Sequence, residues 1–201
     1  ADEYLTGYVK EKLLIAKDMA NKLPQFERNV KALEQVQPIP LKPSEIGVSL
    51  GSTWIPTEIY KQFMDDLLEL SGHISDYTDL KYSEYAGEYF IEDKNLNSVK
   101  IDKIYCTKRM NPLNILENTL NLRPIRINDK VEELGKKTGE MKEKYVLNVK
   151  ETILAKAKQE EIKNAFNSWI FKDKKTLNYL ANIYNEKFNN YVTRTYDGSN
   201  L

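Results

Sequence analysis

The apolar positions of the first 70 residues follow helical spacing. Thr6 and Thr57 can each cap a helix, and each is followed by an apolar stripe. Pro24 suits the first turn of another helix that lies between them in the sequence. Residues 38–43 are rich in proline and are expected to be extended, whereas Ser44–Leu50 predicts a short helix. The stripes are Val9, Leu13, Ala16 and Ala20, then Phe26, Val30 and Leu33, and finally Ile59, Phe63, Leu67 and Leu70.

The pattern changes after Gly72, where segments with β propensity replace the helical stripes. Residues 79–93 are rich in tyrosine and contain the turn signal Ala86-Gly87, which together predict a β-hairpin. Val99–Cys106 predicts a further strand.

A helix and a second pair of strands are expected next. Asn111 and Pro112 form a cap and a first helical residue before Leu113, Leu116 and Leu120. Ile125 and Ile127 alternate with Arg126, which is typical of a strand, and Tyr145–Leu147 is expected to return after a polar loop.

The C-terminal quarter predicts two amphipathic helices. Asn148, with Glu151 three residues later, resembles a capping box, and Asp173 can cap the last helix. The apolar stripes are Leu154, Ile162, Phe166, Trp169 and Ile170, followed by Leu177, Leu180, Tyr184, Phe188 and Tyr191. The outline is an α+β fold: a helical N-terminal part, a small and mostly antiparallel sheet, and two long C-terminal helices. The expected subdivisions are 1–71, 72–147 and 148–201, packed as one unit.

Composition narrows the class of protein. Hydrophobic residues make up 41% of the 201 residues and 13 are tyrosine, which favours a folded domain. There is no apolar run of roughly 20 residues, and residues 1–20 carry acids and lysines where a signal peptide is apolar. A single cysteine, Cys106, excludes an internal disulfide. The expectation is a soluble, cytoplasmic protein that does not enter a membrane.

Charge is distributed unevenly, although the net charge is zero. Residues 1–93 hold 9 basic and 17 acidic side chains, residues 94–144 hold 12 and 7, and residues 145–201 hold 9 and 6. The acidic half can dock on a complementary protein, and the basic half can face a polyanion. Ordinary compositional variation explains the same asymmetry.

The basic half supplies a set of candidate DNA-binding residues among the aromatic residues Tyr105 and Tyr145. Cations interleaved with aromatic rings suit a nucleic-acid backbone and unstacked bases. Solvated surface charge is the alternative reading of the same residues. The set consists of Lys108, Arg109, Arg123, Arg126, Lys136 and Lys137.

Enzymatic chemistry has little support in the residues. His73 is the only histidine, so a histidine-based zinc site or a Ser-His-Asp triad lacks partners. Asp79, Glu92 and Lys94 have the residue types of a metal-dependent nuclease, in which two carboxylates bind the ion and lysine orients water. A polar hairpin end is the simpler reading. We expect no catalytic residue, no metal and no cofactor in this segment.

Several segments resemble one stretch of very large bacterial proteins carried by phages and conjugative elements. Those proteins join an adenine-specific DNA methylase-like region to a Swi/Snf-like superfamily-two helicase. The similar segments occur in the same order in this chain, with Tyr8 where the family pattern has asparagine. They are Tyr4–Leu13, Leu50–Pro56, Asn114–Leu122, Tyr184–Phe188 and Tyr196–Leu201.

The resemblance implies a connector lying just before the helicase domain of a longer chain. The start at Ala1 and the polar run-out from Thr193 also suggest a piece of a larger protein. ATP and magnesium are then expected in the parent, as are DNA and the neighbouring methylase and helicase domains as partners. The leading hypothesis is a non-catalytic connector that positions DNA. The alternatives are a protein-interaction module that uses the acidic residues Asp65, Asp66 and Glu69, and the metal-dependent nuclease.

Overall fold

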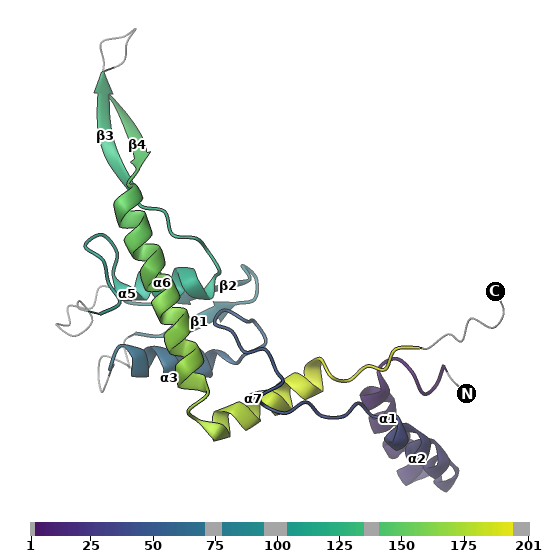
Figure 1. The fold of residues 1–201 in the computed structure, drawn as a ribbon. Coiled ribbons are helices and arrows are strands. Elements are labelled where there is room, and N and C mark those ends of the chain that lie inside the picture. Colours follow the sequence, from purple (N-terminus) through teal and green to yellow (C-terminus); the bar gives the residue numbers. More distant parts are fainter. Residues whose placement is uncertain (1–2, 71–77, 95–103, 135–140, 195–201) are drawn as a thin grey trace, which may run out of the picture. The chain divides into compact units, whose positions relative to one another are not determined.

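The protein has an α+β fold whose elements gather into two compact units. The computed structural model describes residues 3–70, 78–94, 104–134 and 141–194 (Figure 1). The terminal unit comprises Ala1–Gly47 and Lys174–Leu201, and the central unit comprises Val48–Asp173. These limits differ from the boundaries that the sequence pattern suggested after residues 71 and 147.

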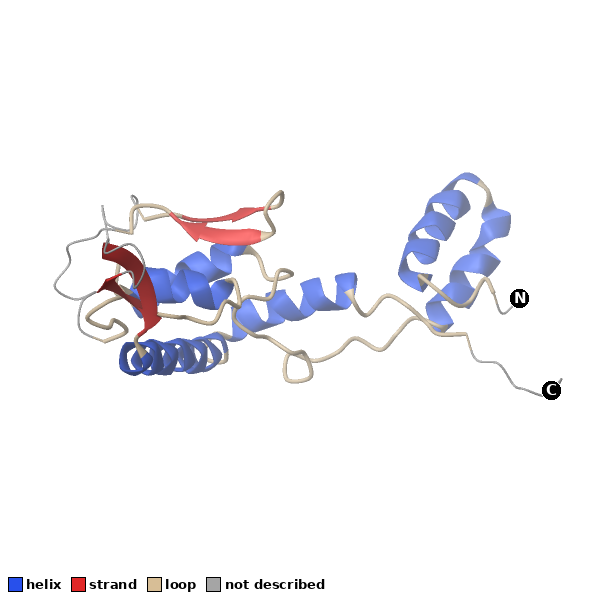
Figure 2. Ribbon diagram, turned by 90° about the horizontal axis from the view of Figure 1, so that it is seen from above, coloured by secondary structure: helices blue, strands red, loops and turns tan. Residues whose placement is uncertain are grey.

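The terminal unit contains a pair of helices with a small apolar core. Helix α1 (Val9–Lys22), the 3-10 turn η1 (Pro24–Phe26) and α2 (Glu27–Gln35) follow one another, and Figure 2 shows α1 and α2 side by side. Val9, Ala16 and Leu33 are buried at the centre of this pair, on the stripes that the sequence predicted.

Helix α7 (Lys174–Lys187) completes the terminal unit through polar contacts with the proline-rich stretch. The buried Asn185 side chain accepts a hydrogen bond from the Leu41 N–H and donates to the Leu41 carbonyl, both at 2.8 Å. The asparagine amide thus pairs with the backbone of Leu41 as a neighbouring strand would, and it satisfies both polar groups of that residue. Gly7 and Val192 also exchange backbone hydrogen bonds at 2.8 and 2.9 Å.

The central unit is built around aromatic side chains of α3 (Thr57–Leu67) and α6 (Val149–Ile170). Phe166 is fully buried, with ring centroids 5.1 Å from Phe63 and 5.6 Å from Tyr60. Helix α5 (Pro112–Leu120) contributes six more buried residues, among them the leucines and isoleucine Leu113, Ile115, Leu116 and Leu120. These contacts hold α6 in place, and the candidate site lies at its first turns.

Two antiparallel hairpins make up the described strands. Strand β1 (Leu80–Ser83) pairs with β2 (Glu88–Ile91), and β3 (Asn128–Leu134) pairs with β4 (Met141–Leu147). The turn between β1 and β2 contains Gly87 at φ 68°, as the Ala86-Gly87 signal predicted. The β3–β4 hairpin adjoins the N-terminal end of α6 (Figure 1).

Side chains of α5 occupy the outer edge of β2. Asn121 accepts a hydrogen bond from the Tyr89 N–H and donates to the Tyr89 carbonyl, both at 2.7 Å. One turn earlier, the Glu117 carboxylate accepts from the Ile91 N–H at 2.7 Å and lies 2.6 Å from Lys94 Nζ. Every second residue of β2 therefore bonds to α5 rather than to β1, and the strand edge is closed.

The expected helix Ser44–Leu50 is wrong, because the described chain forms only turns there. The Glu45 N–H donates to the Lys42 carbonyl at 2.9 Å, and the Glu45 carboxylate accepts from the Lys42 N–H at 2.7 Å. This side-chain bond closes an isolated turn, which competes with a continuing helix.

The expected strand at Ile125–Ile127 also starts too early. Both isoleucines are buried and Arg126 is exposed, as alternation predicted, but the ladder begins at Asn128. The Ile127 N–H donates to Thr152 Oγ1 at 3.0 Å, and its carbonyl accepts from the Asn148 N–H at 2.8 Å. The partner of this extended segment is the start of α6. The predicted strand Val99–Cys106 lies largely outside the described residues, and residues 104–106 are not in a strand.

The prediction that Leu154, Phe188 and Tyr191 face inward is wrong. Leu154 is 46% exposed, because Thr152, Ala155 and Gln159 occupy the buried side of the first half of α6. Beyond α7, Phe188 is 53% exposed, and Tyr191 is similarly placed. The polar residues Thr152 and Gln159 are buried here because their side chains bond to backbone groups, Thr152 to the Ile127 N–H and Gln159 to the Arg123 carbonyl.

Candidate nucleic-acid interface

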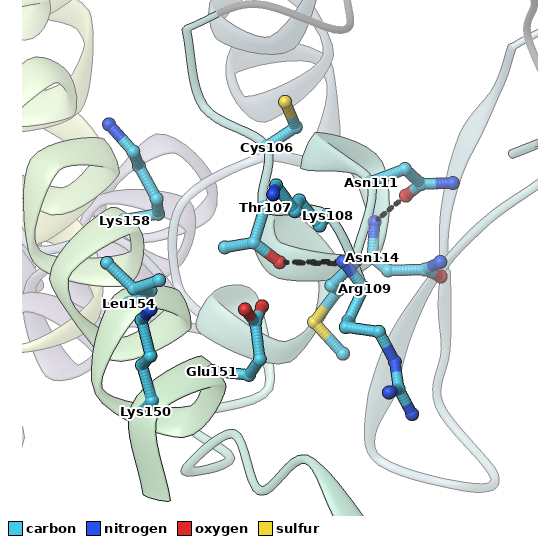
Figure 3. Close-up of a pocket in the computed structure, with 11 residues that line it drawn as sticks. Cys106, Thr107, Lys108, Arg109, Asn111, Asn114, Lys150, Glu151, Leu154 and Lys158 are labelled. Atoms are coloured by element: carbon cyan, nitrogen blue, oxygen red, sulfur yellow. Dashed lines mark hydrogen bonds between the residues drawn. The ribbon is translucent and has the colours of Figure 1, made fainter. Parts of the chain in front are cut away.

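A basic groove lies where the loop of residues 106–111, the start of α5 and the first turns of α6 converge (Figure 3). Its volume is about 790 Å³, within the range of small-molecule sites. Most of the residues that line the groove are polar or cationic, while Met110 and Leu154 supply apolar surface. The remaining lining residues are Cys106, Thr107, Lys108, Arg109, Asn111, Asn114, Lys150, Glu151 and Lys158.

Both helices begin at this groove with an asparagine cap. The Asn111 side chain accepts a hydrogen bond from the Asn114 N–H at 2.8 Å, and Asn148 accepts from the Glu151 N–H at 3.0 Å. The sequence predicted both caps. A helix N-terminus carries partial positive charge, so both helices add to the positive potential of the groove.

Four cationic side chains line the groove, and they differ in their partners. Lys108 and Lys150 are exposed, and within the part of the chain that the structure describes neither one forms an ion pair. Arg109 lies 2.8 Å from Asp129, and Lys158 lies 2.7 Å from Glu161. Two lysines from separate elements are thus available to an anion.

A chain of hydrogen bonds connects the loop to the start of α6. The Arg109 guanidinium donates to one carboxylate oxygen of Asp129, and the Asn148 side chain donates to the other, both at 2.8 Å. Since Asn148 also caps α6, this chain fixes the position of Arg109 relative to the helix.

One carboxylate lies among these cations. Figure 3 shows the Glu151 side chain between α6 and the loop that carries Thr107. Its Oε2 is enclosed by protein atoms and has no hydrogen-bond partner among the described residues. The expected reciprocal bond of a capping box is not formed, because the Asn148 N–H donates to the Ile127 carbonyl instead.

The candidate DNA-binding residues do not all gather at the groove. Lys108 and Arg109 line it, whereas Arg123 forms an ion pair with Glu88 of the β1–β2 hairpin and Arg126 is exposed outside the lining. Lys136 and Lys137 lie outside the described residues, as does His73.

Sequence reasoning missed Lys150, Glu151 and Lys158 as site residues. Their spacing carried a signal, since positions 150, 154 and 158 share one face of a helix. That face was assigned to the core through Leu154, so its lysines were left as ordinary surface charge.

The residues of the nuclease hypothesis are divided between two ion-pair sets. Asp79 and Glu92 flank Lys81, whose Nζ lies 3.8 and 2.8 Å from their carboxylates. Lys94 instead pairs with Glu117. The hydrogen bond that the Lys81 ammonium donates to the Glu92 carboxylate raises the pKa of Lys81, so an ammonium group stays between the two acids. No three His, Cys, Asp or Glu side chains in the described ranges are grouped to hold a metal ion.

The acidic residues of the docking hypothesis also have partners. Asp66 accepts a hydrogen bond from Trp169 Nε1 at 2.7 Å, and Asp65 lies 3.5 Å from Lys61 Nζ. Glu69 ends the helical region with φ 50°. The docking role of these three residues stays a prediction.

Comparison with known proteins places the groove within a recognised family. Residues 49–190 match the model of the family described as Domain of unknown function (DUF8437), so the chain belongs to that family. The match includes every residue that lines the groove, and the helix pair α1–α2 precedes it. No curated protein and no solved structure matches the chain. Of the described helices, none is both long and apolar enough to cross a membrane.

Proposed function

We propose that this member of the DUF8437 family is a non-catalytic, DNA-binding connector whose basic groove holds a phosphodiester backbone. The observation that carries the proposal is the pair Lys108 and Lys150, which face one groove from a loop and a helix and have no carboxylate partner among the described residues. Cations that already form salt bridges must give up those bonds to bind phosphate, whereas these two do not.

The rest of the groove adds to its affinity for a polyanion. Arg109 and Lys158 are held by Asp129 and Glu161 in exposed pairs, which contribute little to stability and exchange readily for a phosphate. Two helix N-termini lie at the same place, and their backbone dipoles favour anions. Binding in such a groove depends on salt, because each neutralised phosphate releases counterions.

The resemblance to methylase–helicase proteins supplies the context. In such a parent, the connector would hold DNA between the methylase-like region and a Swi/Snf-like helicase, which itself would bind ATP and magnesium. The ion pairs of Lys81 with Asp79 and Glu92 support a non-catalytic role for this segment, because the acids of the nuclease hypothesis already hold a cation.

Fluorescence anisotropy of the 201-residue chain with labelled single-stranded and duplex DNA tests the proposal. The double variant Lys108→Gln/Lys150→Gln removes both cations. Titrations between about 50 and 200 mM salt should then show the slope of log K against log salt reduced by about 1.4 for single strands and 1.8 for duplexes.

Lys156→Gln is the matched control. Lys156 is exposed on the same helix, six residues after Lys150, which places it on the other side of α6 from the groove. Its loss should leave the salt slope unchanged. Equal slopes for the double variant and the control would overturn the proposal, as would the absence of binding at low salt.

A further inference from the structure

The carboxylate of Glu151 is an unexplained group in a groove that otherwise attracts anions. Its Oε2 is enclosed, and no donor among the described residues reaches it. An enclosed acceptor without a donor loses its hydration and gains nothing in return, and the cost is larger for a charged group. A ligand that brings an N–H donor restores that bond.

The local fold leaves this carboxylate without a role in the helix cap. At the third position of α6, a glutamate ordinarily bonds back to the N–H of the capping residue. Here the Asn148 N–H is used by the Ile127 carbonyl at 2.8 Å, so Glu151 has no role in the cap through its side chain. If the Glu151 side chain rotates toward the open part of the groove, its Oε2 leaves the enclosed position and can accept a hydrogen bond from a ligand.

The neighbours of Glu151 define the chemistry of that ligand. Lys108 and Lys150 favour an anion, Met110 and Leu154 offer apolar contact, and the Glu151 carboxylate favours a hydrogen-bond donor. A nucleotide satisfies all three requirements when its phosphate meets the lysines and its unstacked base enters the groove. Phosphate alone does not, because a phosphodiester has no donor and is repelled by the carboxylate.

We propose that Glu151 is a specificity-determining residue that accepts a hydrogen bond from the exocyclic amino group of an unstacked base in single-stranded DNA. This inference rests on the proposed DNA-binding function of the groove. Among the bases, cytosine presents its N4 amino group to carboxylates, whereas uracil carries a carbonyl oxygen at that position. A contact at the exocyclic position therefore favours cytosine over uracil, whose base donor is the ring N3–H.

The test compares labelled oligo(dC) and oligo(dU) of about 20 nucleotides, a length that exceeds the site of one small binding domain. The two strands carry the same charge, so their phosphate contacts are matched. Anisotropy titrations with the unaltered chain should show oligo(dC) binding about tenfold more tightly. In Glu151→Gln the amide both donates and accepts, and the two affinities should come within about twofold.

The outcomes separate this inference from the proposed function. Equal affinity of the unaltered chain for both oligonucleotides overturns the role of Glu151, and this comparison needs no variant to fold. A dC preference that persists in Glu151→Gln, with its circular dichroism unchanged, overturns it as well. If binding in either case still weakens in the Lys108→Gln/Lys150→Gln variant, the backbone-binding function stands. If the unaltered chain shows no salt-dependent binding to either oligonucleotide, both proposals fail.

Discussion

Replacement of Asn121 by alanine is expected to release the β1–β2 hairpin from α5. The Asn121 amide makes two hydrogen bonds of 2.7 Å with the backbone of Tyr89, one as acceptor and one as donor. Alanine keeps the helix-ending conformation of this position, at φ −84° and ψ 8°, but removes both partners. The change therefore isolates the edge contact of β2.

The expected cost follows from the two backbone groups left behind. A donor or acceptor that loses its partner in the interior costs about 1–3 kcal/mol. Both bonds are partly buried, so water can replace the lost partners of the Tyr89 N–H and carbonyl only in part. We expect Asn121→Ala to lower the free energy of unfolding by about 2–4 kcal/mol, because the Glu117 bond to Ile91 holds only one further backbone group of the strand.

Urea denaturation followed by circular dichroism measures this loss. Asn118→Ala is the control, since Asn118 lies in the last turn of α5, which Asn121 caps, and its side-chain amide donates to the Asn114 carbonyl one turn earlier, at 2.8 Å. That variant should lose no more than about 0.5 kcal/mol. If Asn121→Ala costs as little as the control, the closure of the strand edge does not stabilise this unit and the reasoning is refuted.

Two further predictions concern the same unit. Gly51→Ala should destabilise it by at least about 2 kcal/mol in the same assay, because Gly51 has φ 91° and an added Cβ would lie 2.6 Å from the Leu120 carbonyl oxygen; Gly47→Ala, where nothing lies within 4 Å, should cost less. Desolvation raises the pKa of Tyr89 to about 12 and that of Tyr60 further. The unfolded chain then loses these protons first, so stability should fall as pH rises above about 10. In an absorbance titration, both phenols should ionise only at higher pH or on unfolding; ionisation of all 13 tyrosines together near pH 10 in the folded protein would contradict this.

Local signals in the sequence predicted much of the fold. The stripes through Val9 and Leu33, the caps Asn111 and Asn148, and the turn at Gly87 are confirmed. Each depends on residues within one helical turn or one hairpin, so periodicity and turn chemistry suffice to find it.

Contacts between distant residues could not be predicted in this way. The terminal unit joins distant segments of the chain, where Asn185 pairs with Leu41, 144 residues earlier. The strand at Ile125–Ile127 was displaced because Thr152 and Asn148 took the hydrogen bonds of Ile127. No pattern in a single sequence reveals which side chain will satisfy a backbone group so far away.

The candidate site was predicted only in part for the same reason. Lys108 and Arg109 were selected from a basic stretch, but the partner lysine lies on α6, which reaches the groove through tertiary packing. Glu151 was assigned to a capping box, and only the use of the Asn148 N–H by Ile127 leaves its carboxylate without that partner.

Lys108 and Arg109, which are neighbours in the sequence, have different roles in the groove. The Arg109 guanidinium and the Asn148 side chain share the carboxylate of Asp129, which ties the loop to the cap of α6. Arg109 therefore contributes first to the shape of the groove, by fixing the loop that carries Lys108 against the helix that carries Lys150. Lys108 is exposed and forms no ion pair with any residue that the structure describes. In the proposed binding mode, Arg109 positions the loop while Lys108 and Lys150 supply the charge, so neighbouring basic residues need not contribute equally to affinity.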